Sequence, residues 1–113
     1  MNKIIKIGVD DIIINPAAQS EMLTKAANER NPKMRVTGLC EINDDILVAL
    51  EERHESDGES VEYVFAPFRS VNEDEVVAEI SERYFSHFSL LGGFDVKKVK
   101  WALFAHYPDK DET

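Results

Sequence analysis

The chain is poor in the residues that build disulfide-linked, membrane-embedded or low-complexity proteins. Its 113 residues include one cysteine, five glycines and four prolines, and no apolar run approaches the length of a membrane span. The single cysteine excludes an intramolecular disulfide and a zinc site built mainly from cysteine. Residues 1–15 hold a short apolar run but no small-residue cleavage site, unlike a signal peptide. We therefore expect a cytoplasmic protein with no membrane partner.

Basic residues are also scarce. The 13 Lys and Arg residues are outnumbered by 22 Asp and Glu residues, which gives a formal net charge of −9. Nucleic-acid-binding proteins usually carry a basic face, and the basic residues here form only two small groups, so we expect no nucleic-acid partner. The stretch from Glu41 to Glu62 holds nine carboxylates and one arginine. It is predicted to be a solvated loop region, with docking of a basic protein partner as the alternative.

What is present is the pattern of a folded domain, with 43% hydrophobic and 31% charged residues. Hydrophobic periodicity and turn residues predict a strand with a short apolar run after it, a helix, a hairpin and a further strand, at residues 3–14, 15–31, 33–54 and 61–68. Asn15 is expected to cap the first helix and Pro16 to begin it. The hairpin is expected to turn at Asn43-Asp44.

Residues 70–93 give the strongest helix pattern. A capping box is expected from Ser70 or Asn72 with a glutamate three residues later, and acidic residues crowd the first turn, where the helix dipole favours them. One apolar stripe follows helical spacing, at Val77, Ile80, Tyr84, Phe88 and Leu91. The helix is expected to end at Gly92-Gly93, and residues 96–107 predict a last strand.

The element order is β-α-β-β-β-α-β, in a single domain over residues 1–113 with a frayed tail at 108–113. This order predicts an α+β fold with a mostly antiparallel sheet of about five strands packed against two helices, close to a ferredoxin-like pattern with one additional strand.

Several predicted strands are apolar on both faces, as where Ile46, Val48 and Leu50 alternate with Leu47 and Ala49. A half-exposed antiparallel strand alternates apolar with polar residues instead, so the second face of the sheet needs cover. Another copy of the chain would supply it, because large apolar patches usually mark interfaces, and we expect a homo-oligomer. The alternatives are one helix on each face, or a ligand pocket between sheet and helices.

Asp10 and Asp11 are the first candidates for a metal or acid–base pair. Successive strand side chains point to opposite faces, and no other oxygen ligands lie nearby in sequence, so a solvated turn or bulge is favoured over a metal site. Strand alternation places Cys40 on one apolar face with Met34, Val36, Gly38 and Ile42. We expect a small buried hydrophobe there rather than a reactive thiolate, and neither a metal nor a cofactor in the protein.

The histidines and aromatic residues supply the remaining candidates. His54, His87 and His106 match no metal-ligand spacing. His87 is predicted on the second helix at the border of the core and His106 on the last strand, and with Tyr84 these are the candidate acid–base residues. Four aromatic residues of the later strands are expected in the core or, alternatively, in a site for a flat or apolar ligand: Tyr63, Phe65, Trp101 and Phe104.

No motif identifies a function. The first expectation is a small, soluble, non-catalytic homo-oligomeric domain that binds a protein partner or a small ligand. The alternative is a small cofactor-independent enzyme, with a pocket between sheet and helices and His87 or His106 as acid or base. A weaker alternative is an acidic inhibitor that mimics nucleic acid on a basic site.

Overall fold

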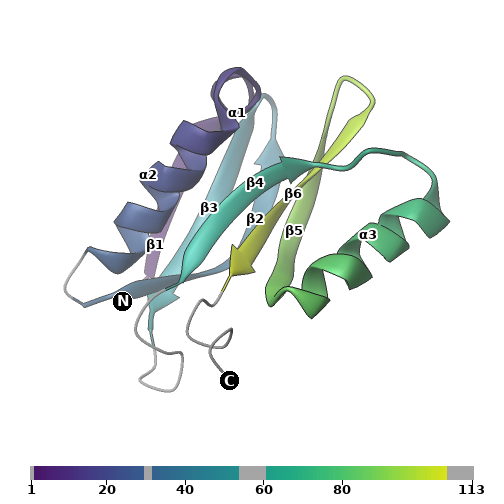
Figure 1. The fold of residues 1–113 in the computed structure, drawn as a ribbon. Coiled ribbons are helices and arrows are strands. Elements are labelled where there is room, and N and C mark those ends of the chain that lie inside the picture. Colours follow the sequence, from purple (N-terminus) through teal and green to yellow (C-terminus); the bar gives the residue numbers. More distant parts are fainter. Residues whose placement is uncertain (1, 30–31, 54–60, 107–113) are drawn as a thin grey trace.

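A computed structural model describes residues 2–29, 32–53 and 61–106 (Figure 1). The predicted acidic loop at 55–60, His54 and the predicted tail at 108–113 lie outside these residues. Nine helices and strands are described, in the order β1 (Asn2–Gly8), α1 (Val9–Ile14), α2 (Pro16–Asn28), β2 (Met34–Ile42), β3 (Asp45–Glu52), β4 (Glu62–Pro67), α3 (Glu73–Phe85), β5 (Phe88–Val96) and β6 (Val99–His106).

The strands form two three-stranded sheets. The first sheet has the order β1-β3-β2 and the second has the order β4-β6-β5, and every pairing is antiparallel. The α+β class and the antiparallel pairing are thus confirmed. The prediction of one sheet with about five strands and two helices is wrong, because the described residues form six strands in two sheets and three helices. The structure does not show a ferredoxin-like arrangement.

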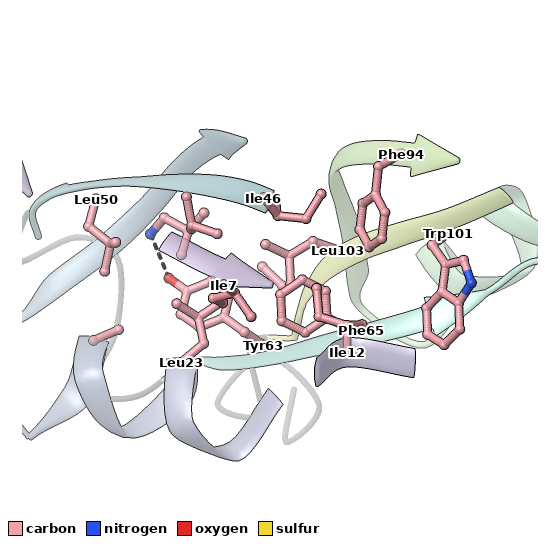
Figure 2. Close-up of a cluster of buried hydrophobic side chains, with 14 of the residues drawn as sticks. Ile7, Ile12, Leu23, Ile46, Leu50, Tyr63, Phe65, Phe94, Trp101 and Leu103 are labelled. Atoms are coloured by element: carbon pink, nitrogen blue, oxygen red, sulfur yellow. Dashed lines mark hydrogen bonds between the residues drawn. The ribbon is translucent and has the colours of Figure 1, made fainter. Parts of the chain in front are cut away.

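The two sheets share one core, which fills the space between their inner faces (Figure 2). The first sheet contributes aliphatic side chains such as Ile46 and Leu50, and the second contributes Phe65, Trp101 and Leu103. The sheets meet along β2 and β5, where a Cβ on Gly92 would lie 3.0 Å from the Leu39 side chain. Glycine at this position therefore allows the close approach of the two strands.

A buried hydrogen bond also joins the sheets. The backbone N–H of Val36 on β2 donates to the hydroxyl of Tyr63 on β4, at 2.9 Å (Figure 2). Tyr63 is 2% exposed, so water cannot replace its oxygen as the acceptor for Val36. Because a buried backbone N–H without a partner is costly, this bond fixes the position of β2 against the second sheet.

Helix α2 lies beside the free edge of β4, in the same layer as the second sheet. It presents one polar side chain per turn to that edge, from Ser20, Thr24 and Asn28. Alternate backbone N–H groups of β4 and the residue before it donate to them, from Phe65 to Ser20 (2.9 Å), from Tyr63 to Thr24 (2.9 Å) and from Val61 to Asn28 (3.3 Å). Because four helical residues rise about 6 Å and two strand residues about 6.8 Å, the spacings nearly match. The helix therefore satisfies edge groups that another strand would otherwise pair with.

Residues 9–14 differ from the prediction. Asp10 and Asp11 lie in the first turn of α1 and not in a turn or bulge, although both are exposed as expected. The strand ends at Gly8, since the next backbone N–H, that of Val9, donates to Asp44 O at 2.8 Å. Ile12 is then fully buried, so core packing overrides the strand propensity of the isoleucine run.

The predicted helix over residues 70–93 is too long. Helix α3 ends at Phe85, and residues 88–96 form β5. His87 has a φ of 65°, a left-handed conformation that breaks the helix. Gly92 and Gly93 therefore lie inside a strand and do not end a helix. His87 is exposed in the connection between α3 and β5, not at the border of the core.

The predicted N-cap at Asn15 and the hairpin turn are confirmed, and so is Asn72 as one of the two cap candidates, but the Asn72 N–H donates to Ser70 Oγ at 3.0 Å and not to Glu75 as a capping box requires. Asn15 caps α2 by accepting from Ala18 N at 3.1 Å, and Asn72, rather than Ser70, caps α3 by accepting from two backbone N–H groups. The β2–β3 hairpin turns at Asn43, which has a φ of 58°, as asparagine readily allows.

Within the described ranges, no helix is long and apolar enough to span a membrane.

Candidate functional site

The outer face of the first sheet carries exposed apolar side chains. We call it the open face; its apolar side chains are Ile4 on β1, Leu47 and Ala49 on β3, and Cys40 and Ile42 on β2. Register pairs them in neighbouring rows across the three strands. Ile4 is 60% exposed and Ile42 is 51% exposed, so the described helices leave this face uncovered.

A β-bulge places Cys40 on the open face. The pairing of β2 with β3 shifts by one residue between Val36 and Gly38, so Cys40 lies opposite Leu47. A one-residue shift moves the following side chains to the other face. The prediction that Cys40 shares an apolar face with Val36 and is buried is therefore wrong, and the thiol is exposed. The glycine in the strand, Gly38, was the available signal for the bulge.

The polar groups of the open face are balanced in charge. Arg35 forms a salt bridge with Glu51 at one end of the face, and Lys6 and Asp45 lie on the rows at the other end. Two cations and two anions thus border the apolar centre, whereas the whole chain has a net charge of −9. The open face therefore lacks the negative charge that would repel an acidic surface.

The outer face of the second sheet is covered, in contrast. Phe104 is 1% exposed and Ala102 is fully buried. The Phe68 ring packs edge-on against Phe104 with centroids 6.2 Å apart, and the guanidinium of Arg83 from α3 lies 4.6 Å from the centroid of Phe104. Through this cation–π contact α3 covers part of the sheet.

Helix α3 itself is poorly buried. None of its residues is buried, and its packing is chiefly against β5. Besides the side that faces the sheet, it has a second apolar side, which we call the α3 stripe: Val77, Ala78, Ser81, Tyr84 and Phe85. These positions recur at intervals of three and four and fall within about one third of the helix circumference. Phe85 is 88% exposed and Tyr84 is 56% exposed.

A shallow hollow of about 360 Å³ lies beside α3. It is lined by Arg69, Glu79, Glu82, Arg83, Ser86 and Phe88. Arg69 is bound to both acids of this set, at 3.3 Å from its Nε to Glu79 and at 3.7 Å from its Nη2 to Glu82. The charges in the hollow therefore compensate one another and do not select an anionic or cationic ligand.

The candidate acid–base residues are not brought together at this hollow, since neither His87 nor His106 lines it. His106 on β6 stacks on Phe88 with centroids 4.4 Å apart, and its Nδ1 lies 3.3 Å from a carboxylate oxygen of Glu62. A carboxylate orients an imidazole in this way in many acid–base sites. Tyr84 lies on the exposed α3 stripe. Its carbonyl oxygen accepts a hydrogen bond from the backbone N–H of His87, at 3.0 Å.

The four aromatic residues predicted for a core or ligand site are all buried. Tyr63, Phe65 and Trp101 belong to the core between the sheets, and Phe104 lies under α3. Their exposed fractions are only 1–8%, which shows that they pack in the interior. A ligand role for these residues stays a prediction.

Neither metal ligands nor similarity to known proteins assigns a function to the described residues. Among residues 2–29, 32–53 and 61–106, no group of three or more His, Cys, Asp or Glu side chains could hold a metal ion. The sequence matches no protein-family model, and neither curated proteins nor solved structures show a significant match to it. The surfaces of this chain are therefore what indicates its function.

Proposed function

We propose that the protein is a small cytoplasmic domain without catalytic activity, which assembles with further copies of itself through the open face and in that form binds a protein partner or a small ligand. The observation that supports self-assembly is the apolar centre of the open face. Half-buried Leu47 and Ala49 and the exposed Cys40 lie there between exposed isoleucines of both edge strands. Contiguous apolar patches of this kind mark interfaces on soluble proteins.

Charge favours a second copy as the partner on this face. Two copies of a chain with net charge −9 repel each other over most of their surfaces. The open face carries one cation and one anion at each end, from the Arg35–Glu51 pair and from Lys6 with Asp45. A second copy of this acidic chain therefore meets little charge repulsion at the open face.

The test is the mass of the native protein and of a variant with a charge in the centre of the open face. Leu47→Glu is expected to convert the oligomer to a monomer, because it would bury an unpaired carboxylate between copies. The matched control is Val99→Glu, which places the same charge on an exposed valine of the second sheet. Light scattering and native mass spectrometry, with circular dichroism to verify folding, measure the outcome.

Cys40 provides an independent measurement, because it is the only thiol of the chain and lies on the open face. Its reaction rate with a thiol reagent is expected to fall as protein concentration rises, and Leu47→Glu should abolish that dependence. A wild-type protein that is monomeric throughout the micromolar range, with a reaction rate independent of concentration, would disprove self-assembly.

A second candidate is favoured by the His106–Glu62 pair on the Phe88 ring. In a cofactor-independent enzyme this imidazole would act as acid or base toward a ligand over the outer face of the second sheet. Native mass spectrometry should then show extra mass that disappears on denaturation. Replacement of the imidazole in His106→Gln should abolish turnover of that compound while folding persists. A protein that retains no small molecule, before or after incubation with metabolite pools, would count against this candidate.

A further inference from the structure

We infer that the α3 stripe of one copy packs on the open face of another copy, so that the interface is helix-on-sheet rather than sheet-on-sheet. This inference rests on the self-assembly proposed above and specifies its geometry. Both surfaces expose apolar side chains: the stripe includes Phe85, at 88% exposure, and the open face includes Ile4, at 60% exposure.

Each surface lacks what the other supplies. A helix of 13 residues is only marginally stable in water without tertiary packing, yet α3 buries no residue in its own chain. The first sheet has a second apolar face, which a helix can cover. One contact between copies meets both requirements.

The dimensions of the two surfaces are compatible. The seven residues of β1 and three strands give an open face of about 24 Å by 14 Å, and α3 is about 20 Å long and 10 Å wide. Two open faces in direct contact would bury roughly 700 Å² in total, which falls short of the roughly 1,200–2,000 Å² of specific interfaces. The stripe covers roughly 200 Å² of an open face, so two reciprocal helix-on-sheet contacts would bury roughly 800 Å² in total, slightly more than two open faces.

Charge also favours the helix over a second sheet. Three exposed carboxylates border the α3 stripe, those of Asp74, Glu75 and Glu82. The row of the open face next to that of Asp45 contains Lys6 beside Leu47, with Cys40 as the third member and no acid. A carboxylate next to the stripe can therefore pair with Lys6 when the stripe covers Leu47.

A complementation experiment tests this geometry. Leu47→Glu blocks the open face and leaves the stripe intact, whereas Phe85→Glu blocks the stripe and leaves the open face intact. Each variant alone is expected to be monomeric, and an equimolar mixture is expected to form a 1:1 heterodimer with one intact contact. Ala17→Glu, on the exposed side of α2, is the control and should assemble as the wild type does.

If the heterodimer with its one intact contact is short-lived, disulfide cross-linking can still detect that contact. A Ser81→Cys variant in a Cys40→Ser background places its only thiol on the stripe. Mixed with wild-type chain under oxidising conditions, it should form at least about tenfold more disulfide heterodimer than an Ala17→Cys variant in that background, because bound thiols have a high effective concentration.

The outcomes separate this inference from self-assembly itself. If Leu47→Glu is monomeric while Phe85→Glu assembles normally, the open faces pack on each other and the helix-on-sheet inference is wrong. If neither substitution changes the mass of the assembly, both the inference and the proposed function fail. If both variants are monomeric but their mixture neither assembles nor cross-links above the control, the helix-on-sheet contact is also excluded.

Discussion

The two sheets of this protein differ most in what lies on their outer faces. Both have apolar side chains there, but Phe104 of the second sheet is 1% exposed under α3, while Ile4 of the first sheet is 60% exposed. A strand that is apolar on both faces therefore needs both of them covered. Its sequence does not specify which part of the molecule, or which other molecule, covers the second face. In one sheet the chain supplies the cover itself, and in the other the face remains available to a further molecule.

The largest expected effect tests this difference directly. Phe104→Ala should lower the free energy of unfolding by about 3–5 kcal/mol, because it leaves a cavity under α3. Ile4→Ala, on the open face, should lower it by about 0.5 kcal/mol or less in the monomer, because Ile4 is 60% exposed. Urea denaturation at the lowest usable protein concentration measures both. Equal losses would mean that the open face is covered within the monomer.

The next effect concerns the hydrogen bond that joins the sheets. Tyr63→Phe removes the acceptor of the Val36 N–H and should destabilise the protein by about 1–3 kcal/mol, because that donor is buried. Tyr84→Phe is the matched control, since Tyr84 is 56% exposed and should change stability little. If the two substitutions cost the same, the bond from Val36 does not fix the first sheet against the second.

A smaller effect is expected at the edge of the second sheet. Thr24→Val keeps the shape of the side chain but removes the acceptor of the Tyr63 N–H, and should cost about 1–2 kcal/mol at this partly buried site. Amide hydrogen exchange at Tyr63 should become faster. The comparison is with Thr37→Val on β2, because the exposed Thr37 hydroxyl donates to the carbonyl oxygen of Ala49 on β3; there the stability should be nearly unchanged.

The smallest effect concerns the helix that covers the second sheet. Asn72→Ala removes the cap of α3 and should cost about 1 kcal/mol. Faster amide exchange at Asp74 and Glu75 should accompany the loss, because the Asn72 side chain accepts from both. Ser81→Ala, on the outward side of the same helix, serves as the control. Unchanged exchange in Asn72→Ala would show that packing, not the cap, fixes the start of α3.

Sequence predicts well what depends on neighbouring residues. The caps at Asn15 and Asn72 and the turn at Asn43 follow from side-chain hydrogen bonds or backbone preferences that span a few positions. The two-sided apolar character of the strands was also readable from Leu47 and Ala49 alternating with buried neighbours. These local signals established the α+β class and the antiparallel hairpin.

Predictions failed where distant contacts decide the structure. Helical periodicity continues from α3 through Phe88 and Leu91, and only the left-handed backbone at His87 separates helix from strand. Cys40 moved to the open face because one residue is added to β2 near Gly38. Both errors concern a single residue whose conformation depends on packing against other elements, and the second one hid an entire surface.

The row of Ser20, Thr24 and Asn28 also affects the order in which the chain can fold. Its partners on and before β4 lie 45, 39 and 33 residues later in the sequence. While the chain is being synthesised, β1, α2 and the β2–β3 hairpin are complete before these partners exist. The first half of the protein therefore cannot complete these contacts until the second half has been synthesised. Such long-range contacts slow folding relative to a chain of local contacts.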